Sequence, residues 1–174
     1  MTRTAIVRAT DRGVDMLIRI AEIVSAILLW LIFAVLVAEL VSRNLFSHSL
    51  AGSWEVAAFL MAAMFSLGLA PALRANSHVR VVMLSGLLTG RPARILDALI
   101  LLIAFMVSSY AALALAKLSL TSLSRSAKSW ELSLPLVLPQ AAVTLGMALF
   151  ALTFAARLLL LFIGAPERSA EDQE

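Results

Sequence analysis

The sequence contains no cysteine, so disulfide bonds, thiolate metal sites and thiol redox chemistry are excluded. Charge is also missing from most of the apolar part of the chain. Three of its four long apolar runs, residues 56–73, 98–116 and 132–156, contain no Asp, Glu, Lys, Arg or His. An ionisable side chain inside a membrane span is the usual mark of an ion or proton path, although it costs about 3 kcal/mol to place there. These three runs therefore offer no such path.

Apolar residues, in contrast, are abundant. They make up 61% of the 174 residues, and the mean hydropathy is +0.97. Four runs, 20–41, 56–73, 98–116 and 132–156, each have about the 20 residues that a helix needs to cross a bilayer. We therefore predict an all-α integral membrane protein, a single membrane domain over residues 1–174 with four transmembrane helices plus interfacial amphipathic helices.

The positive charges predict the orientation of these spans. Ten of the 14 Lys and Arg residues lie before the first run, between the second and third, or after the fourth. Because cytoplasmic loops carry the excess of Lys and Arg, we predict that both termini are cytoplasmic. The same placement accounts for the pI near 10.2 without a nucleic-acid partner, since the arginines flank the apolar runs instead of forming a basic groove.

Three segments outside the runs complete the expected layout. Residues 1–19 mix apolar and charged residues, which predicts a cytoplasmic interfacial helix that runs on into the first span; a frayed, solvated terminus is the alternative. Residues 78–90 are apolar but too short to cross the membrane, which predicts a second cytoplasmic interfacial segment. Residues 157–174 form the expected cytoplasmic tail. The first run is too long for a cleaved signal peptide and lacks a small-residue cleavage site, so we expect it to be retained.

The tripeptide Ser-Trp-Glu stands at 53–55 and again at 129–131, ahead of the second and fourth runs. At a helix entrance Ser can cap the helix, Glu suits the positive helix end and Trp prefers the headgroup layer. In the fourth run Ser133 is the expected cap, with Pro135 in the first turn. A kink at Pro139 is the functional alternative, because broken helices form sites in transporters.

Small residues recur every four positions in the second and third runs, and such rows permit close helix contact in lipid. The two rows could face each other, or one could receive a helix of another protein. They consist of Ala58, Ala62, Ser66 and Ala70, and of Ala104, Ser108, Ala112 and Ala116.

Few polar side chains remain that could do chemistry. Glu22 and Glu39 lie near the two ends of the first run, and Glu39 stands four residues before Arg43, which predicts an ion pair that completes the helix rather than a proton carrier. His48 and His78 are expected on opposite faces of the membrane, so they cannot share a haem. No serine has a histidine and an acid near it. We therefore predict no enzyme activity, no catalytic, substrate-binding or metal-binding residues, and no cofactor.

Several short motifs occur in a fixed order between the end of the first run and the start of the third. The motifs are Ser42-Arg43-Asn44-Leu45-Phe46, Ser53-Trp54-Glu55, Gly68, Arg74 and Ser77-His78-Val79. In the order and spacing of these motifs, the chain resembles the small membrane subunit of tripartite ATP-independent periplasmic (TRAP) transporters, the DctQ-like family. Leu134, Pro135 and Gly146 also resemble the last span of that family, whereas Val82 departs from it, because many members have an Asp there.

The resemblance implies partners and a function. It implies a complex in the bacterial inner membrane with a large, DctM-like permease subunit and a periplasmic, DctP-like solute-binding protein. It implies uptake of an organic acid driven by an ion gradient, usually of sodium, with the substrate and ion sites in the large subunit. The small subunit would then be an anchor and scaffold embedded in membrane lipid.

Within this interpretation, a set of residues near the span ends is expected at the subunit interface. Membrane anchoring and helix capping are the alternative roles for them. Two other functions also stay open, a stand-alone small homo-oligomeric transporter and a membrane assembly or anchoring protein. The expected interface residues are Arg43, Trp54, Glu55, Gly68, Arg74, His78 and Arg80.

Overall fold

The computed structural model describes residues 2–75 and 91–163, and within these ranges the chain is folded into long helices without a strand. The helices are α1 (Thr2–Phe46), α2 (Ser53–Ala75), α4 (Arg91–Ser124) and α5 (Val137–Ile163). All four are long and apolar enough to cross a membrane. The predicted all-α fold with four membrane-spanning helices is therefore confirmed.

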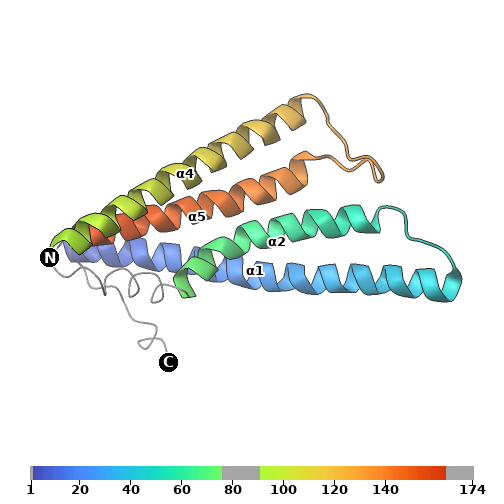
Figure 1. Ribbon diagram of the computed structural model, residues 1–174, viewed down its shortest axis with the longest axis horizontal. Coiled ribbons are helices and arrows are strands. Elements are labelled where there is room, and N and C mark those ends of the chain that lie inside the picture. Colours follow the sequence, from blue (N-terminus) through green and yellow to red (C-terminus); the bar gives the residue numbers. More distant parts are fainter. Residues whose placement is uncertain (1, 76–90, 164–174) are drawn as a thin grey trace.

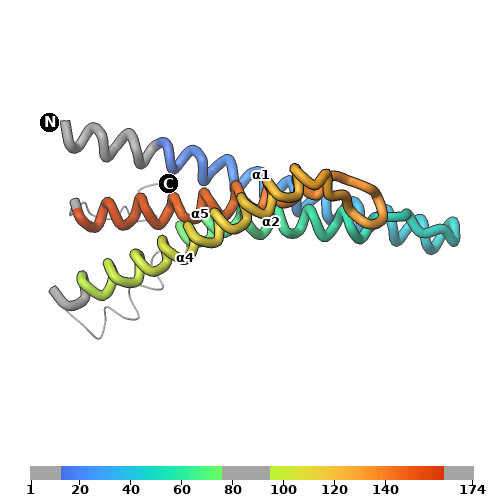
Figure 2. Tube along the Cα trace, turned by 90° about the horizontal axis from the view of Figure 1, so that it is seen from above, coloured from blue at the N-terminus to red at the C-terminus, as the bar shows by residue number. Residues whose placement is uncertain are grey.

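The helices form an open row in the order α4, α5, α2, α1 (Figure 1). Within the described ranges α1 packs on α2, α2 on α5 and α5 on α4, with a smaller contact between α1 and α5. Seen from above, α1 and α4 diverge at one end with α5 between them (Figure 2). We call this end, where α1 starts and α5 ends, the basal end, and the opposite end the loop end.

Helix α1 is 45 residues long and unbroken. At 1.5 Å per residue it measures about 68 Å, more than twice the hydrocarbon core of about 30 Å. Residues 2–19, where an interfacial helix running on into the first span was predicted, are helical and form the first part of α1. The segment predicted at 78–90 and the tail beyond residue 163 lie outside the described residues.

Small side chains line the contacts between helices. Within the part of the chain that the structure describes, no large side chain is fully buried, and the buried residues are mostly alanine and serine. Helices α5 and α2 approach closely at Gly146, where an added Cβ would lie 2.4 Å from the backbone carbon of Ser66 on α2. Large apolar side chains point outward instead, as expected for a surface that faces lipid.

The two rows of small residues do not face each other. Helix α4 packs extensively only on α5 within the described ranges. Of the row of small residues on α4, Ser108 is the member that is buried. On α2, Ser66 and Ala70 are buried, but Ala58 and Ala62 are exposed. Positions four apart drift around a helix of 3.6 residues per turn by about 40° per step. A row spaced by four therefore leaves the packed face after two or three steps.

The fourth span begins at Val137 instead of near residue 132. Ser133 does not cap it, because Ser133 lies in the preceding loop with a φ of 53°. Pro135 also precedes the helix and pairs with Lys128 in an isolated antiparallel bridge. Pro139 falls in the first turn of α5, where the missing N–H has no intrahelical partner to lose. No kink is needed to accommodate Pro139.

Candidate functional site

The middle of the bundle offers no polar site within the described ranges. Several hydroxyl groups there bind their own helices, because they donate to carbonyl groups three or four residues earlier, as Ser66 does to Ala63 at 3.0 Å. Charged side chains gather at the two ends of the bundle instead. The bonds run from Ser108 to Ala104 (2.7 Å), from Thr144 to Gln140 (2.7 Å) and from Thr153 to Leu149 (2.9 Å).

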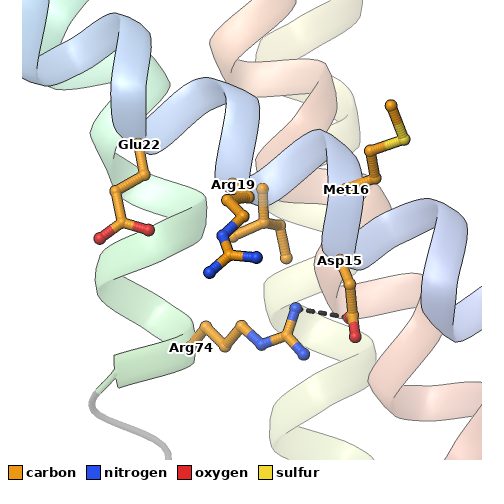
Figure 3. Close-up of a pocket in the computed structure, with 6 residues that line it drawn as sticks. Asp15, Met16, Arg19, Glu22 and Arg74 are labelled. Carbon is orange, nitrogen blue, oxygen red and sulfur yellow. Dashed lines mark ion pairs between the residues drawn. The ribbon is translucent and has the colours of Figure 1, made fainter. Parts of the chain in front are cut away.

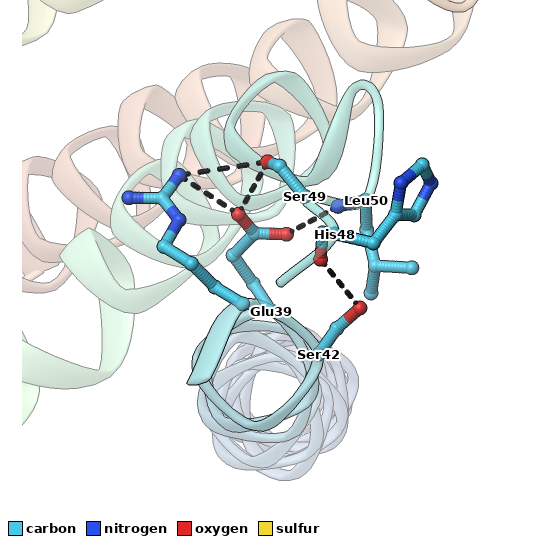
Figure 4. Close-up of polar contacts among 6 residues, drawn as sticks. Glu39, Ser42, His48, Ser49 and Leu50 are labelled. Atoms are coloured by element: carbon cyan, nitrogen blue, oxygen red, sulfur yellow. Dashed lines mark hydrogen bonds and ion pairs between the residues drawn. The ribbon is translucent and has the colours of Figure 1, made fainter. Parts of the chain in front are cut away.

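At the loop end, the buried carboxylate of Glu39 holds the loop between α1 and α2 (Figure 4). Its Oε1 accepts hydrogen bonds from Nη2 of Arg43 at 3.0 Å and from Oγ of Ser49 at 2.6 Å. Its Oε2 accepts one from the backbone amide of Leu50 at 2.8 Å. The predicted ion pair of Glu39 with Arg43 is confirmed, and the same carboxylate also fixes the backbone of the following loop.

Glu55, at the start of α2, holds the other loop of this end. Its carboxylate accepts hydrogen bonds from Oγ of Ser129 at 3.0 Å and from the backbone amides of Trp130 at 3.2 Å and Leu132 at 3.1 Å. The Ser129 hydroxyl in turn accepts one from the amide of Leu134 at 3.1 Å. Glu55 thus joins α2 to a loop that is more than 70 residues away in sequence, and ties one helical hairpin to the other.

The loop that Glu55 binds, residues 127–136, is a short hairpin. The amide of Ser129 donates to the carbonyl of Leu134 at 2.8 Å, and that of Leu136 to the carbonyl of Ala127 at 3.0 Å. The second Ser-Trp-Glu tripeptide lies inside this hairpin and ends well before Val137. The repeat predicted a helix entrance here, and that prediction is wrong. The Ser and Trp of the second tripeptide instead bind the Glu of the first.

Glycine is required where the hairpin meets α2. Gly52 has a φ of +77°, a conformation that other residues rarely adopt. A Cβ at this position would also lie 2.3 Å from Cγ of Leu132. The two tryptophans beside this contact are exposed, Trp54 to 63% and Trp130 to 97%. The loop end thus presents two indole rings on a backbone that hydrogen bonds hold in place.

At the basal end, cationic side chains tie α2 to its neighbours. Nη1 of Arg74 lies 2.5 Å from Oδ1 of Asp15 on α1, and Nη2 of Arg157 on α5 donates to the carbonyl of Leu73 at 3.0 Å. The second bond satisfies a carbonyl near the C-terminal end of α2, where cations are favoured. A recess of about 540 Å³ opens beside the Arg74 to Asp15 pair (Figure 3). Among the described residues no group of three His, Asp or Glu is placed to bind a metal ion.

The residues expected at a subunit interface thus differ in their surroundings. Arg43, Glu55 and Arg74 bind groups of their own chain, and a Cβ at Gly68 would meet Oγ of Ser25 at an ordinary 3.8 Å. Trp54 is exposed, and His78 and Arg80 lie outside the described residues. The sequence did not predict several residues of these clusters, although the repeated Ser-Trp-Glu tripeptide drew attention to Ser129. The missed residues are Ser129, Leu132, Ser49, Gly52, Asp15 and Arg157.

These features define a multi-pass membrane protein whose spans are built for packing, with charged groups that hold its own ends together. The family described as "Tripartite ATP-independent periplasmic transporters, DctQ component" matches residues 32–164, more than half of the chain. The chain belongs to this family. It is a small permease component of a TRAP transporter in the inner membrane, as its motifs predicted, and the family is a transporter component rather than an enzyme family. A search of curated proteins gave no match.

Proposed function

We propose that this chain is the scaffold subunit that holds a large, DctM-like permease in the membrane during uptake of an organic acid. In this proposal a DctP-like periplasmic protein delivers the acid, and an ion gradient drives the transport. The substrate and ion sites belong to the large subunit. Family membership supports a role in a tripartite transporter, and the remaining steps rest on the physical character of the four helices.

The observation that carries the scaffold role is the charge-free middle of the bundle. An organic anion and its coupling cation need fixed charges or strong dipoles at the membrane midplane. Residues 56–73, 98–116 and 132–156 supply no charge, and the hydroxyl groups of Ser108, Thr144 and Thr153 already bind their own helices. Such helices are suited to packing against another membrane protein and poorly suited to binding an ion.

The open row supports a role beside a larger subunit. A closed bundle would bury its helices against each other, whereas α4 has α5 as its main neighbour within the described ranges. Large apolar side chains such as Met106, Val107 and Leu113 of α4 are more than half exposed. These faces can pack against lipid or against the helices of a second subunit.

The loop end would face the periplasm if the excess of Lys and Arg marks the cytoplasmic side, with both termini in the cytoplasm. Trp54 is then placed to contact a partner directly. Arg43 and Glu55 would act through the loops whose shape they set. The remaining interface candidates are Gly68 within the spans, and Arg74, His78 and Arg80 on the cytoplasmic side.

Reconstitution tests the proposal. Liposomes that contain this chain alone should not accumulate a carboxylate under a sodium or proton gradient, whereas liposomes with the large subunit and the binding protein added should. Accumulation by the chain alone would contradict the scaffold role and favour a stand-alone transporter. No co-purification with the large subunit would contradict it as well.

A matched pair of variants tests the interface. Trp54→Ala should weaken co-purification with the large subunit, because it removes a 63% exposed indole beside the α2 entrance. Trp130→Ala removes an even more exposed indole, from the hairpin. It is the control for loss of an exposed tryptophan at this end of the bundle, and it should leave co-purification unchanged. Equal retention of the large subunit by both variants would remove Trp54 from the interface.

A further inference from the structure

The recess at the basal end, which we call the basal recess, combines charges from two helices. One wall is α1 and the other is the last turn of α2 (Figure 3). It has a volume of about 540 Å³. Its lining residues are Asp15, Met16, Ile18, Arg19, Glu22 and Arg74.

Two guanidinium groups enter this recess from different helices. Figure 3 shows the side chains of Arg19 from α1 and Arg74 from α2 reaching into the same space. Asp15 pairs with Arg74. Neither Arg19 nor Glu22 has an ion-pair partner among the residues that the structure describes. Two like charges that face one space favour an anion between them.

The net charge of the recess narrows the class of ligand. Its two arginines are balanced by the carboxylates of Asp15 and Glu22, so the lining is formally neutral. A purely anionic ligand gains from the arginines but is repelled by Glu22. A ligand with both a phosphate and an ammonium group satisfies both kinds of side chain. The location favours the same class, because the recess lies at the last turn of α2, where charged residues border the apolar spans and lipid headgroups are expected.

We propose that the basal recess binds the headgroup of a zwitterionic phospholipid with a primary ammonium group, phosphatidylethanolamine in chemical terms. The phosphate lies between Arg19 and Arg74, and the ammonium group lies at Glu22. Met16, which is 67% exposed beside the charged groups, offers apolar surface to the acyl chains. This inference concerns the isolated chain and does not depend on the proposed scaffold role.

Lipid titration of the full chain, purified in detergent and stripped of lipid, tests the site by native mass spectrometry. One equivalent of short-chain phosphatidylethanolamine should bind more tightly than phosphatidylglycerol. Arg19→Ala should weaken phosphatidylethanolamine binding about fivefold, as expected for loss of one partly exposed charge contact. Glu22→Gln should weaken phosphatidylethanolamine binding but not phosphatidylglycerol binding. Both side chains are exposed, so neither change removes part of the core.

Controls decide between the possible sources of the phosphate. Arg125→Ala, the same change at an exposed position of the loop end, should leave lipid binding unaltered. Inorganic phosphate at millimolar concentration should not compete; effective competition would make the recess a site for free phosphate and overturn the lipid proposal. Wild-type lipid binding by Arg19→Ala, or an unchanged lipid preference in Glu22→Gln, would also overturn it.

Discussion

The close contact between α2 and α5 at Gly146 gives the sharpest test of how this bundle is held together. A Cβ at this position would lie 2.4 Å from the backbone carbon of Ser66, 2.6 Å from its oxygen and 2.7 Å from the amide nitrogen of Leu67. These atoms belong to the backbone of α2, so they cannot rotate away as a side chain would. Gly146→Ala should therefore push the two helices apart.

The magnitude follows from two opposing effects. Carbon atoms in contact lie about 3.5 to 4.0 Å apart, so the added methyl group is more than about 1 Å too close. Overpacking of this kind typically costs about 1 to 3 kcal/mol. Alanine gains about 0.5 to 1 kcal/mol over glycine within a helix. Because three backbone atoms lie within 2.7 Å of the added Cβ, we expect a cost in the upper part of its range, about 2 to 3 kcal/mol, and a net destabilisation of about 1 to 2.5 kcal/mol.

Gly68 provides the matched control on α2. A Cβ there would lie 3.8 Å from Oγ of Ser25, an ordinary contact, so Gly68→Ala should leave stability unchanged or slightly raised. The assay is the unfolding of each variant in detergent, monitored through tryptophan fluorescence. If Gly146→Ala proves as stable as Gly68→Ala, the close packing of α2 on α5 is not what holds the bundle together.

Two further variants probe the ends of the bundle. Glu55→Gln should speed amide hydrogen exchange in the hairpin 127–136 by about tenfold, because the charge-assisted hydrogen bonds of the carboxylate weaken. The control Glu131→Gln, at an exposed position of the same hairpin, should leave the exchange rate unchanged. Equal exchange rates in the two variants would refute the role of Glu55. Arg157→Ala should lower the unfolding free energy in detergent by about 1 kcal/mol through loss of its bond to the Leu73 carbonyl; a loss no larger than that of Arg125→Ala, at the exposed loop end, would refute it.

The polar contacts divide into those that the sequence could predict and those that it could not. Glu39 and Arg43 are four residues apart on one helix, where side chains are neighbours whatever the rest of the fold does. Glu55 and Ser129 are brought together only by the packing of one hairpin on the other. In the sequence their tripeptides resemble two equivalent helix entrances, but in the structure the second tripeptide donates hydrogen bonds to the Glu55 carboxylate of the first. Local spacing contains no information about such a contact.

Helix rotation escaped prediction for a related reason. The row spaced by four on α2 correctly included Ser66 and Ala70 but also named Ala58 and Ala62, which are exposed. In water the apolar face of a helix marks the side that packs inward. In lipid every apolar face is equally well solvated, so composition does not distinguish the packed side from the exposed side.

The sequence by itself determined the number and approximate positions of the spans, the absence of charge within three of them and the family. Transfer into lipid depends on the composition of each segment, which is written in the sequence. The tertiary structure decided that the order in space is α4, α5, α2, α1, that α5 approaches the backbone of α2 at Gly146, and that Glu55 joins the two hairpins. These features depend on complementary shapes and on hydrogen bonds between distant residues, which exist only once the helices have met.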